Sequence, residues 1–440
     1  MSNLELGIWS FPVLLLLIFL RIPIGLAMLL CGFVGTWLIM GSTAPILSRL
    51  KFETYSTFSS YSLSIIPLFL LMGQFASLGG MSQSLFKAAN AWLGHRRGGV
   101  AMSAIGACAG FGAICGSSLA TAATMAQVAL PELRRYGYSG ALATGTLAAG
   151  GTLGVLIPPS VVLVIYAILA EQNIAKLFVA AFVPGILAAI GYMIAISIYV
   201  RLYPESAGSS PRQPFGERFR ALAEVWPVLV VFLAVVGGIY LGWFTPTEAA
   251  AVGAAGTGLI ALVNGGLTRE TLISSILSTA TATALIFFIV FGASMYNSFL
   301  ALSQLPTQAA AFITGSGFDP WTVLIGILIF YLVLGCFMDS LSMILLTVPI
   351  FFPIVSMLDF GLGAEEFALW FGILVLIVVE VGLITPPVGM NLFVINSMAK
   401  DIPILHTYRG VTPFVITDIV RTVILTAFPV ISLFMVRWLY

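Results

Sequence analysis

The sequence carries very little charge. Only 8% of its 440 residues are charged, and 18 basic and 17 acidic side chains leave a formal net charge of +1. A water-soluble chain of this length would need a far larger charged surface. The near-neutral balance also gives no reason to expect nucleic acid or another strongly charged partner.

Catalytic and metal-binding motifs are also scarce. The two histidines, His95 and His406, lie far apart, and the four cysteines stand in apolar stretches without a CxxC pair. We therefore expect no metal centre and no cofactor. The chain has no GxxxxGK[ST], HExxH or GxSxG motif. P-loop ATP hydrolysis is thereby excluded, protease or esterase chemistry gains no support, and we do not expect an enzyme.

Long apolar runs dominate the chain, which is 60% hydrophobic with a mean hydropathy of +1.10. Many runs approach the roughly 20 residues that cross a bilayer as a helix. They predict an all-α polytopic membrane protein, whose first run reads as a span rather than a cleaved signal. The predicted spans are 6–20, 24–40, 60–78, 138–170, 177–200, 223–243, 246–264, 279–300, 366–399 and 412–436.

Two apolar segments, 98–134 and 320–356, differ from ordinary spans. The first is interrupted by "CGSS" and the second by "FMDSLS". Each half is too short to cross a bilayer alone. Each segment is therefore predicted to be a re-entrant helical hairpin, with its tip inside the membrane.

Two spans contain a double proline, in "GVLIPPSVV" near Pro158 and in "GLITPPVGM" near Pro386. Proline removes a backbone donor and pushes the preceding residue out of the helical conformation. Within a membrane, the carbonyls released in this way need a partner, which a bound cation can be. A simple kink is the alternative, but two copies, each following a hairpin, favour two functional helix breaks.

The landmarks of the two halves occur in the same order at similar offsets. Gly292 follows Gly73 by 219 residues, Asp339 follows Ser117 by 222, and Pro386 follows Pro158 by 228. Charge-based topology gives the two copies opposite orientations, the inverted-repeat plan of secondary transporters. We predict a first repeat over 1–200, a polar cytoplasmic linker over 201–222 and a second repeat over 223–440.

The basic residues set the predicted orientation, because positively charged loops stay cytoplasmic. With the N-terminus on the periplasmic side, only Arg49, Lys51, Lys176 and Arg437 fall outside, and Arg421 has no clear side. Thirteen residues then fall inside: Arg21, Lys87, Arg96, Arg97, Arg134, Arg135, Arg201, Arg212, Arg218, Arg220, Arg269, Lys400 and Arg409. The first hairpin is predicted to enter from the cytoplasm and the second from the opposite side.

Polar groups gather at the hairpin tips and helix breaks. The first tip offers Gly116, Ser117, Ser118, Thr121 and Thr124, and the second offers Asp339, Ser340 and Ser342. Hydroxyls and free carbonyls are hard oxygen ligands that suit sodium, and a half-helix starting at each tip favours an anion. Close packing of small residues is the alternative for the small side chains. Ser160 and Asn391, after the two breaks, either contact substrate or satisfy the loosened backbone.

Two carboxylates in apolar surroundings need an explanation. An unpaired carboxylate near mid-membrane is costly, and no Lys or Arg accompanies Asp339 or the breaks in sequence. Asp339 is therefore predicted to bind a cation or to take up a proton. Glu380 is either a second such group or a hydrogen-bonding residue between helices. Glu248 follows Thr245 and Pro246 as in a capping arrangement.

With these residues in place, the chain resembles the large membrane subunit of tripartite ATP-independent periplasmic (TRAP) transporters. The resemblance covers essentially the whole chain and rests on "GSSLATAATMAQVALPEL", "GVLIPPSVVLVIYAI", "FTPTEAAAVG", "MDSLSMILLTVPIFFPI" and "LITPPVGMNLFVI". It implies an elevator-type fold, in which a transport domain moves against a scaffold. It also implies sodium-coupled uptake of a small organic acid across the bacterial inner membrane.

The resemblance further implies two partners and a set of sodium ligands. The partners are a soluble periplasmic substrate-binding protein and a small four-span membrane subunit, expected here as a separate chain. Family sodium sites lie between each hairpin tip and its broken helix. By motif position the implied ligands are Gly116, Ser117, Ser118 and Pro158, and Asp339, Ser340, Thr385, Pro386 and Met390. Thr121, Ser160, Ser342 and Asn391 are predicted to lie nearer the substrate.

Three alternatives remain open from the sequence. One is a self-sufficient sodium/carboxylate symporter of related fold that needs no binding protein. Another is an ion channel, although the two hairpins are not repeated around a pore. The third, a membrane enzyme, lacks any nucleophile–base or metal set in the sequence.

Overall fold

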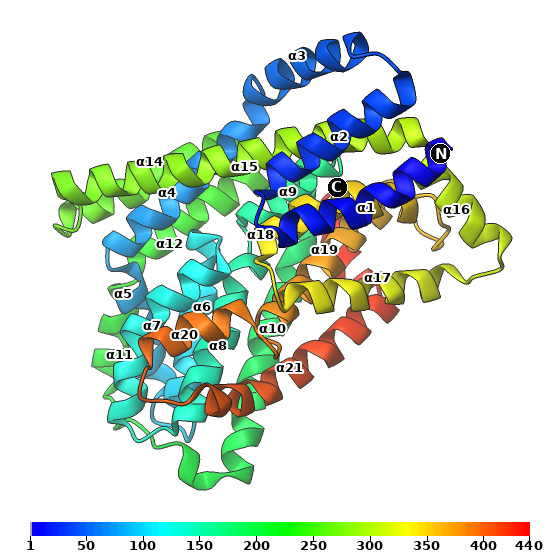
Figure 1. Cartoon of the computed structure of the whole chain (residues 1–440). Coiled ribbons are helices and arrows are strands. Elements are labelled where there is room, and N and C mark those ends of the chain that lie inside the picture. Colours follow the sequence, from blue (N-terminus) through cyan, green and yellow to red (C-terminus); the bar gives the residue numbers. More distant parts are fainter. Residues whose placement is uncertain (1) are drawn as a thin grey trace.

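The computed structural model describes residues 2–440, and over that range every regular element is a helix (Figure 1). Six helices are long and apolar enough to cross a membrane, and two bent helix pairs could raise this number to eight. The prediction of an all-α polytopic membrane protein is confirmed.

The elements of each half follow in chain order. The first half contains α1 (Asn3–Phe19), α2 (Ile24–Met40), α3 (Ala44–Phe58), η1 (Tyr61–Ser64), α4 (Ile65–Leu78), α5 (Met81–Leu93), α6 (Gly99–Cys115), α7 (Ser118–Arg135), α8 (Gly140–Leu156), α9 (Val161–Leu169) and α10 (Ile174–Leu202). The second contains η2 (Pro204–Ser206), α11 (Phe215–Ala223), α12 (Trp226–Phe232), η3 (Leu233–Gly237), α13 (Gly238–Tyr240), α14 (Pro246–Val263), α15 (Arg269–Ser303), α16 (Leu305–Gly315), α17 (Pro320–Gly335), α18 (Ser340–Val355), α19 (Ala364–Leu383), α20 (Met390–Met398), α21 (Ile404–Ala427) and α22 (Val430–Leu439).

A small core joins α1 and α2 to the long helix α15, which runs across the top of Figure 1. Leu14, Met28, Tyr296 and Phe299 are buried in it. The helices approach so closely that a Cβ on Gly292 of α15 would lie 2.2 Å from the carbonyl oxygen of Gly25. Helix α4 packs against α14 and α15 and extends this layer.

A larger core holds the two hairpins and the two broken helices. The first hairpin is α6–α7, followed by α8 and α9, which are bent by 46° at the break over 157–160. The second hairpin is α17–α18, followed by α19 and α20 on either side of the break over 384–389. Both hairpins and both broken helices therefore occur where the sequence predicts them. Both Pro-Pro bonds, Pro158–Pro159 and Pro386–Pro387, are cis.

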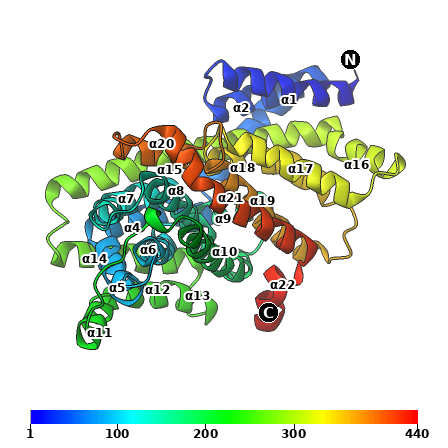
Figure 2. The same cartoon turned by 90° about the horizontal axis from the view of Figure 1, so that it is seen from below.

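The two halves interlock rather than pack as separate blocks (Figure 2). Return arm α7 of the first hairpin packs against α20, and return arm α18 of the second hairpin packs against α9. Each hairpin also packs on its own broken helix through a glycine pair. A Cβ on Gly112 would lie 2.4 Å from the Cα of Gly154, and one on Gly382 would lie 2.6 Å from the Cα of Gly335.

Several span boundaries differ from the prediction. The last predicted span, 412–436, is wrong, because α21 already begins at Ile404 and ends at Ala427. Pro429 disfavours helix at the preceding Phe428, so α22 starts as a separate short helix. The sequence also gave no expectation for α3, whose Glu53 is buried and pairs with Arg49 at 2.8 Å. The capping arrangement at Thr245 and Glu248 is confirmed as a capping box.

The polar segment 201–222 is not a free linker. Many of its side chains are exposed, but Ser206, Ser210 and Arg218 are buried. The amide of Ser139 donates a hydrogen bond to the Ser206 carbonyl at 2.9 Å, which holds the segment at the base of the first hairpin. The guanidinium of Arg218 lies over the ring of Trp92. The segment connects the halves while packing against them.

Candidate functional site

The tips of both hairpins line one cavity of about 550 Å³, here called the tip cavity. Gly116, Ser117 and Ser118 come from the first tip, and Asp339, Ser340 and Ser342 come from the second. The opposite wall is formed by the turn between α1 and α2 and by α15. Segments more than two hundred residues apart in sequence thus meet at one place, with their hydroxyls and one carboxylate together.

The first tip lies against the first break. Helix α6 ends at Gly116, which has a φ of +65°, a conformation that glycine adopts at low cost. A Cβ there would lie 3.3 Å from the carbonyl oxygen of Pro159. Ser117 then caps α7, its hydroxyl accepting a hydrogen bond from the amide of Ala120 at 3.4 Å. The predicted neighbours, Ser117 and the Pro158 region, are therefore close together.

The second tip lies against the second break in the same way. The amide of Gly389 donates a hydrogen bond to the carbonyl of Cys336 at 3.0 Å. Asp339 caps α18, where its carboxylate accepts a hydrogen bond from the amide of Ser342 at 3.1 Å. Asp339 is thus a helix cap that also lines the tip cavity. Capping α18 explains why a carboxylate stands at this position. The cap bond uses Oδ2, and the other carboxylate oxygen stays available to the cavity.

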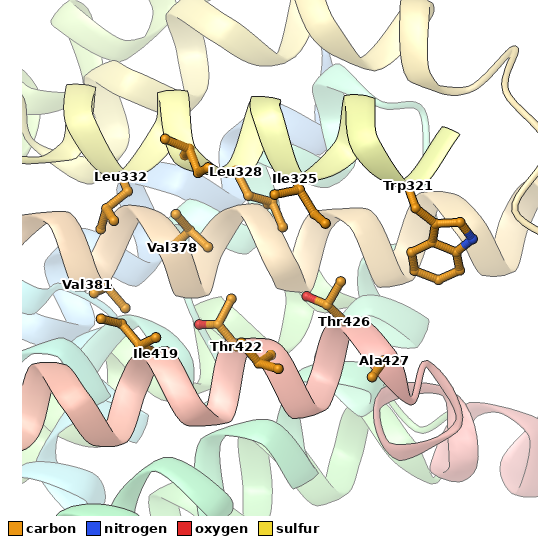
Figure 3. A pocket seen from close by; sticks show the side chains of 12 residues that line it. Trp321, Ile325, Leu328, Leu332, Val378, Val381, Ile419, Thr422, Thr426 and Ala427 are labelled. Carbon is orange, nitrogen blue, oxygen red and sulfur yellow. The ribbon is translucent and has the colours of Figure 1, made fainter. Parts of the chain in front are cut away.

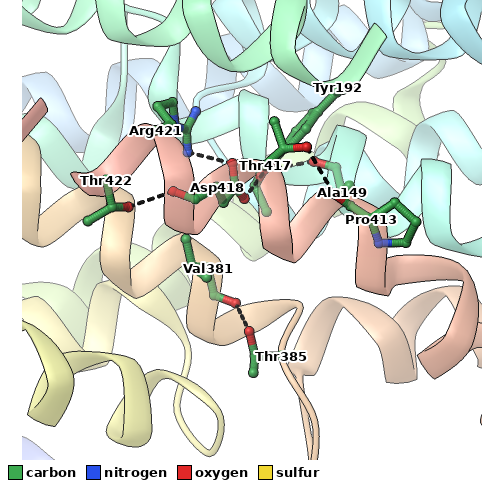
Figure 4. Close-up of polar contacts among 10 residues, drawn as sticks. Ala149, Tyr192, Val381, Thr385, Pro413, Thr417, Asp418, Arg421 and Thr422 are labelled. Atoms are coloured by element: carbon green, nitrogen blue, oxygen red, sulfur yellow. Dashed lines mark hydrogen bonds and ion pairs between the residues drawn. The ribbon is translucent and has the colours of Figure 1, made fainter. Parts of the chain in front are cut away.

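The remaining predicted site residues lie around these contacts. Thr385 donates its hydroxyl proton to the carbonyl of Val381 at 2.6 Å (Figure 4). Met390, the first residue of α20, is half-buried. Ser160 is fully buried and caps α9. Asn391 is fully buried and donates to the carbonyl of Ala148 at 3.3 Å, linking α20 to α8.

Several buried oxygens near the breaks have no hydrogen-bond partner among residues 2–440, and they include Thr121 Oγ1, Thr146 Oγ1 and Asn391 Oδ1. Buried polar atoms are normally paired, and unpaired ones mark places where an ion or ligand can bind. Thr121 stands on the return arm of the first hairpin, and a Cβ on Gly154 would lie 2.3 Å from its hydroxyl oxygen. Sequence reasoning had placed Thr121 and Asn391 near the substrate without knowing their burial.

Two arginines correct the expectation that no basic residue accompanies the breaks. Arg21, in the turn between α1 and α2, lines the tip cavity and has a φ of +66°. Arg421, whose side was undecided, is buried on α21 and pairs with Asp418 at 2.9 Å. Tyr192 of α10 donates its hydroxyl proton to Asp418 at 2.6 Å (Figure 4). The i, i+3 spacing of Asp418 and Arg421 was the available sequence signal; nothing in the sequence placed Arg21 beside the tips.

A second cavity, of about 430 Å³, lies between α17, α19 and α21 (Figure 3). Its lining is apolar apart from the hydroxyls of Thr422 and Thr426 and the ring of Trp321. Such a lining offers nothing to hold a carboxylate or a sodium ion. The tip cavity is therefore the candidate transport site.

Comparison with known proteins agrees with this geometry. A sequence model of the family described as "Tripartite ATP-independent periplasmic transporter, DctM component" matches residues 11–431. The chain is 36% identical to the C4-dicarboxylate TRAP transporter large permease protein DctM of Pseudomonas aeruginosa, over 93% of this chain and 94% of that protein. It is 29% identical to the sialic acid TRAP transporter large permease protein SiaM of Vibrio cholerae, over 95% of each.

The fold also resembles a solved structure. The YdaH transporter of Alcanivorax borkumensis, described as having an unusual topology, superposes with a TM-score of 0.59 at 14% identity, covering 86% of this chain and 88% of that one. At this identity the likeness concerns the fold alone. The match over residues 11–431 shows that the chain is a multi-pass membrane protein of the TRAP transporter large permease family, which is not a family of enzymes.

Proposed function

We propose that this chain takes up a small organic acid by sodium-coupled symport, with a periplasmic binding protein delivering the substrate and a small four-span subunit bracing the scaffold. One observation carries the proposal: both hairpin tips line a single cavity that combines hydroxyls, a carboxylate and an arginine. Oxygen ligands suit sodium, and a guanidinium suits a carboxylate. The proposal places the protein in the bacterial inner membrane with its N-terminus in the periplasm.

The sodium ions would occupy the two places where a tip meets its own break. Ser117 with the Pro158 region forms one, and Asp339 with Thr385 forms the other. The close approach of Gly116 to Pro159 and the hydrogen bond from Gly389 to Cys336 support this pairing. The remaining predicted ligands of the two places are Gly116, Ser118, Ser340, Pro386 and Met390.

The substrate carboxylate would lie in the tip cavity against Arg21, with Ser342 lining the same cavity and the buried groups of Thr121, Ser160 and Asn391 behind it. Substrate classes follow from relatives of the chain. Those named above are permeases for C4-dicarboxylates and sialic acid, and another relative, from Ruegeria pomeroyi, is named as a permease for ectoine and 5-hydroxyectoine. We propose an organic acid of this size range.

The movement proposed is an elevator. The layer of α1, α2, α4, α14 and α15 would stay fixed, while the core of hairpins and broken helices slides past it. The two repeats, 1–200 and 223–440, are joined by the connecting segment between them. Being oppositely oriented, they would provide the outward-facing and inward-facing states of this movement. The close packing of α15 on α2, and of α4 on α14, supports treating these helices as one unit.

Reconstitution in proteoliposomes tests the proposal. The chain, its small membrane subunit and its purified binding protein are combined, and uptake of succinate, sialic acid or ectoine is followed under an inward sodium gradient. We expect saturable uptake that requires both sodium and the binding protein. Uptake without the binding protein would instead establish the self-sufficient symporter, and uptake that continues without sodium would refute sodium coupling.

A further inference from the structure

Glu380 is a carboxylate that the proposed sodium sites do not use. It lies on α19, in the longer arm of the second broken helix, and its side chain is fully buried. Neither of its carboxylate oxygens has a hydrogen-bond partner among residues 2–440. Almost every residue of α19 is buried, so the group has no path to bulk water along its own helix.

Both hairpin tips face this carboxylate. The hydroxyls of Ser118, the first residue of α7, and Ser340, the first residue of α18, are its polar neighbours. Both serines are buried, with 2% and 5% of their surface exposed. The two serines come from hairpins that approach from different halves of the chain. Glu380 is therefore placed where the two tips meet behind the tip cavity.

The charged groups around Glu380 make an unpaired negative charge more costly. Asp339 of α18 and Asp418 of α21 are the acidic groups that act on it. The only nearby positive charge on α21, Arg421, is paired with Asp418 at 2.9 Å, and Asp418 also accepts from Tyr192 of α10. An isolated carboxylate in a dry environment is expensive unless it is neutralised.

We propose that Glu380 binds one monovalent cation, held jointly with the hydroxyls of Ser118 and Ser340, and that this site links the two hairpin tips. The inference rests on the proposed transport function and adds a third cation site to it. Carboxylate and hydroxyl oxygens suit a sodium ion. Because its ligands come from both hairpins, the site is complete only while both tips are closed on α19.

The site couples the tips without any direct bond between them. A cation at Glu380 holds Ser118 and Ser340 together. Opening either tip removes one of its ligands, and the cation is then released. Each of the sodium sites at the two breaks takes ligands from one hairpin, whereas this site takes ligands from both. Ser118 and Ser340, named above among the ligands of the two tip sites, are assigned here to the shared site instead. Ser117 and Asp339 remain with the sites of their own hairpins, since each caps its return arm.

The first test measures cation binding without transport. The purified complex is titrated with NaCl against choline chloride at several pH values, and its apparent Tm is recorded, because a bound cation stabilises the folded state. Glu380→Gln preserves size and mimics the neutral side chain. Glu53→Gln is the matched control, a carboxylate that is also buried but lies on α3 and is paired with Arg49.

If sodium is the occupant, Glu380→Gln raises the sodium concentration for half-maximal stabilisation at least about tenfold, as expected when an interaction with a charged group is lost. Reversal-potential measurements in proteoliposomes then show one positive charge fewer per transport cycle. Glu53→Gln changes neither the sodium response nor the charge count.

A wild-type sodium response and charge count in Glu380→Gln would overturn the proposal. If Glu380→Gln does not fold, the double substitution Ser118→Ala and Ser340→Ala replaces it in the test, because it removes both hydroxyl ligands and leaves the carboxylate. An unchanged sodium response in the double variant would equally overturn the proposal. Failure of the proposed function is distinguishable, since it appears as absent sodium-dependent uptake in the unaltered protein.

Discussion

The two helix breaks share one sequence plan but differ in their surroundings. Residues 157–160 of the first break are all buried, whereas Pro386 and Pro387 of the second are exposed. The hairpins differ in the same way. Nearly all of α6 is buried, while one face of α17 is open, with Ile325, Ile329 and Val333 at least half exposed.

This difference shows that the second break, unlike the first, reaches the surface of the protein. Irregular backbone is tolerated in a membrane only where protein covers it or water reaches it. The carbonyl of Pro387 accepts a hydrogen bond from the hydroxyl of Tyr408 at 2.7 Å, and the exposed prolines beside it require water or a partner subunit. The first break is covered by protein, whereas the second break and one face of α17 are open to the surroundings.

Removing charge from the second tip is expected to have the largest effect on transport. Asp339→Asn keeps a good helix-capping side chain but loses the carboxylate. Loss of an interaction with a charged group costs about 1.5–3 kcal/mol. We therefore expect sodium-coupled uptake in proteoliposomes to fall by about 10- to 100-fold, while the protein still folds and inserts.

Ser117→Ala is the matched variant at the first tip, because Ser117 caps α7 as Asp339 caps α18. It removes a neutral ligand and a cap, so its uptake is expected to fall less than that of Asp339→Asn. Asp339→Ala, which loses both cap and charge, is expected to abolish uptake. Normal uptake by Asp339→Asn would exclude its charge from the sodium site.

An intermediate effect, on stability, is expected where each hairpin packs on its broken helix. Gly112→Ala places a Cβ 2.4 Å from the Cα of Gly154, between two buried helices that cannot separate. Overpacking of this kind costs about 1–3 kcal/mol. In Gly335→Ala the nearest atom is the carbonyl oxygen of Val379 at 3.0 Å, and α17 has room on its exposed face.

We therefore expect Gly112→Ala to lower the apparent Tm of the purified protein more than Gly335→Ala does. Tryptophan fluorescence or size-exclusion chromatography after heating measures the difference. Gly326→Ala serves as the control on α17, because a Cβ there meets nothing within 4 Å. Equal decreases in Tm for Gly112→Ala and Gly335→Ala would contradict the distinction between the buried first hairpin and the second hairpin, which has an exposed face.

The hairpins and breaks could be predicted because glycine, proline and hydroxyl residues interrupt apolar runs, which is a local signal. Charge counting needs only the order of spans, and the orientation that it gives to the loops stays a prediction. The site was harder. That Ser118 and Ser340 face one carboxylate depends on how segments over two hundred residues apart pack together, and no spacing in the sequence encodes it.

The two arginines show which parts of the site can be predicted from the sequence and which cannot. Arg421 could have been recognised, because Asp418 stands one helical turn before it and an intramembrane ion pair is a common solution. Arg21 could not, because its position in a turn fits a cytoplasmic loop equally well. Only the packing of α1 and α2 against α15 brings that turn to the tip cavity.

The smallest effect is expected from the hydroxyl at the second break. Thr385→Val keeps the shape of the side chain but removes the oxygen, which now donates to Val381 at 2.6 Å and has lone pairs left for a cation. A neutral ligand contributes about 0.5–1.5 kcal/mol, so the sodium concentration for half-maximal uptake should rise by about 2- to 10-fold. Thr385→Ser, which retains the hydroxyl, should leave it unchanged.

Ser160→Ala tests the buried counterpart, where the hydroxyl caps α9. If sodium reaches its sites through the exposed second break, Thr385→Val shifts the sodium activation curve and Ser160→Ala shifts it less. An unshifted curve for Thr385→Val would remove its hydroxyl from the sodium ligands, and leave the backbone of the break with Asp339 as the only ligands offered there.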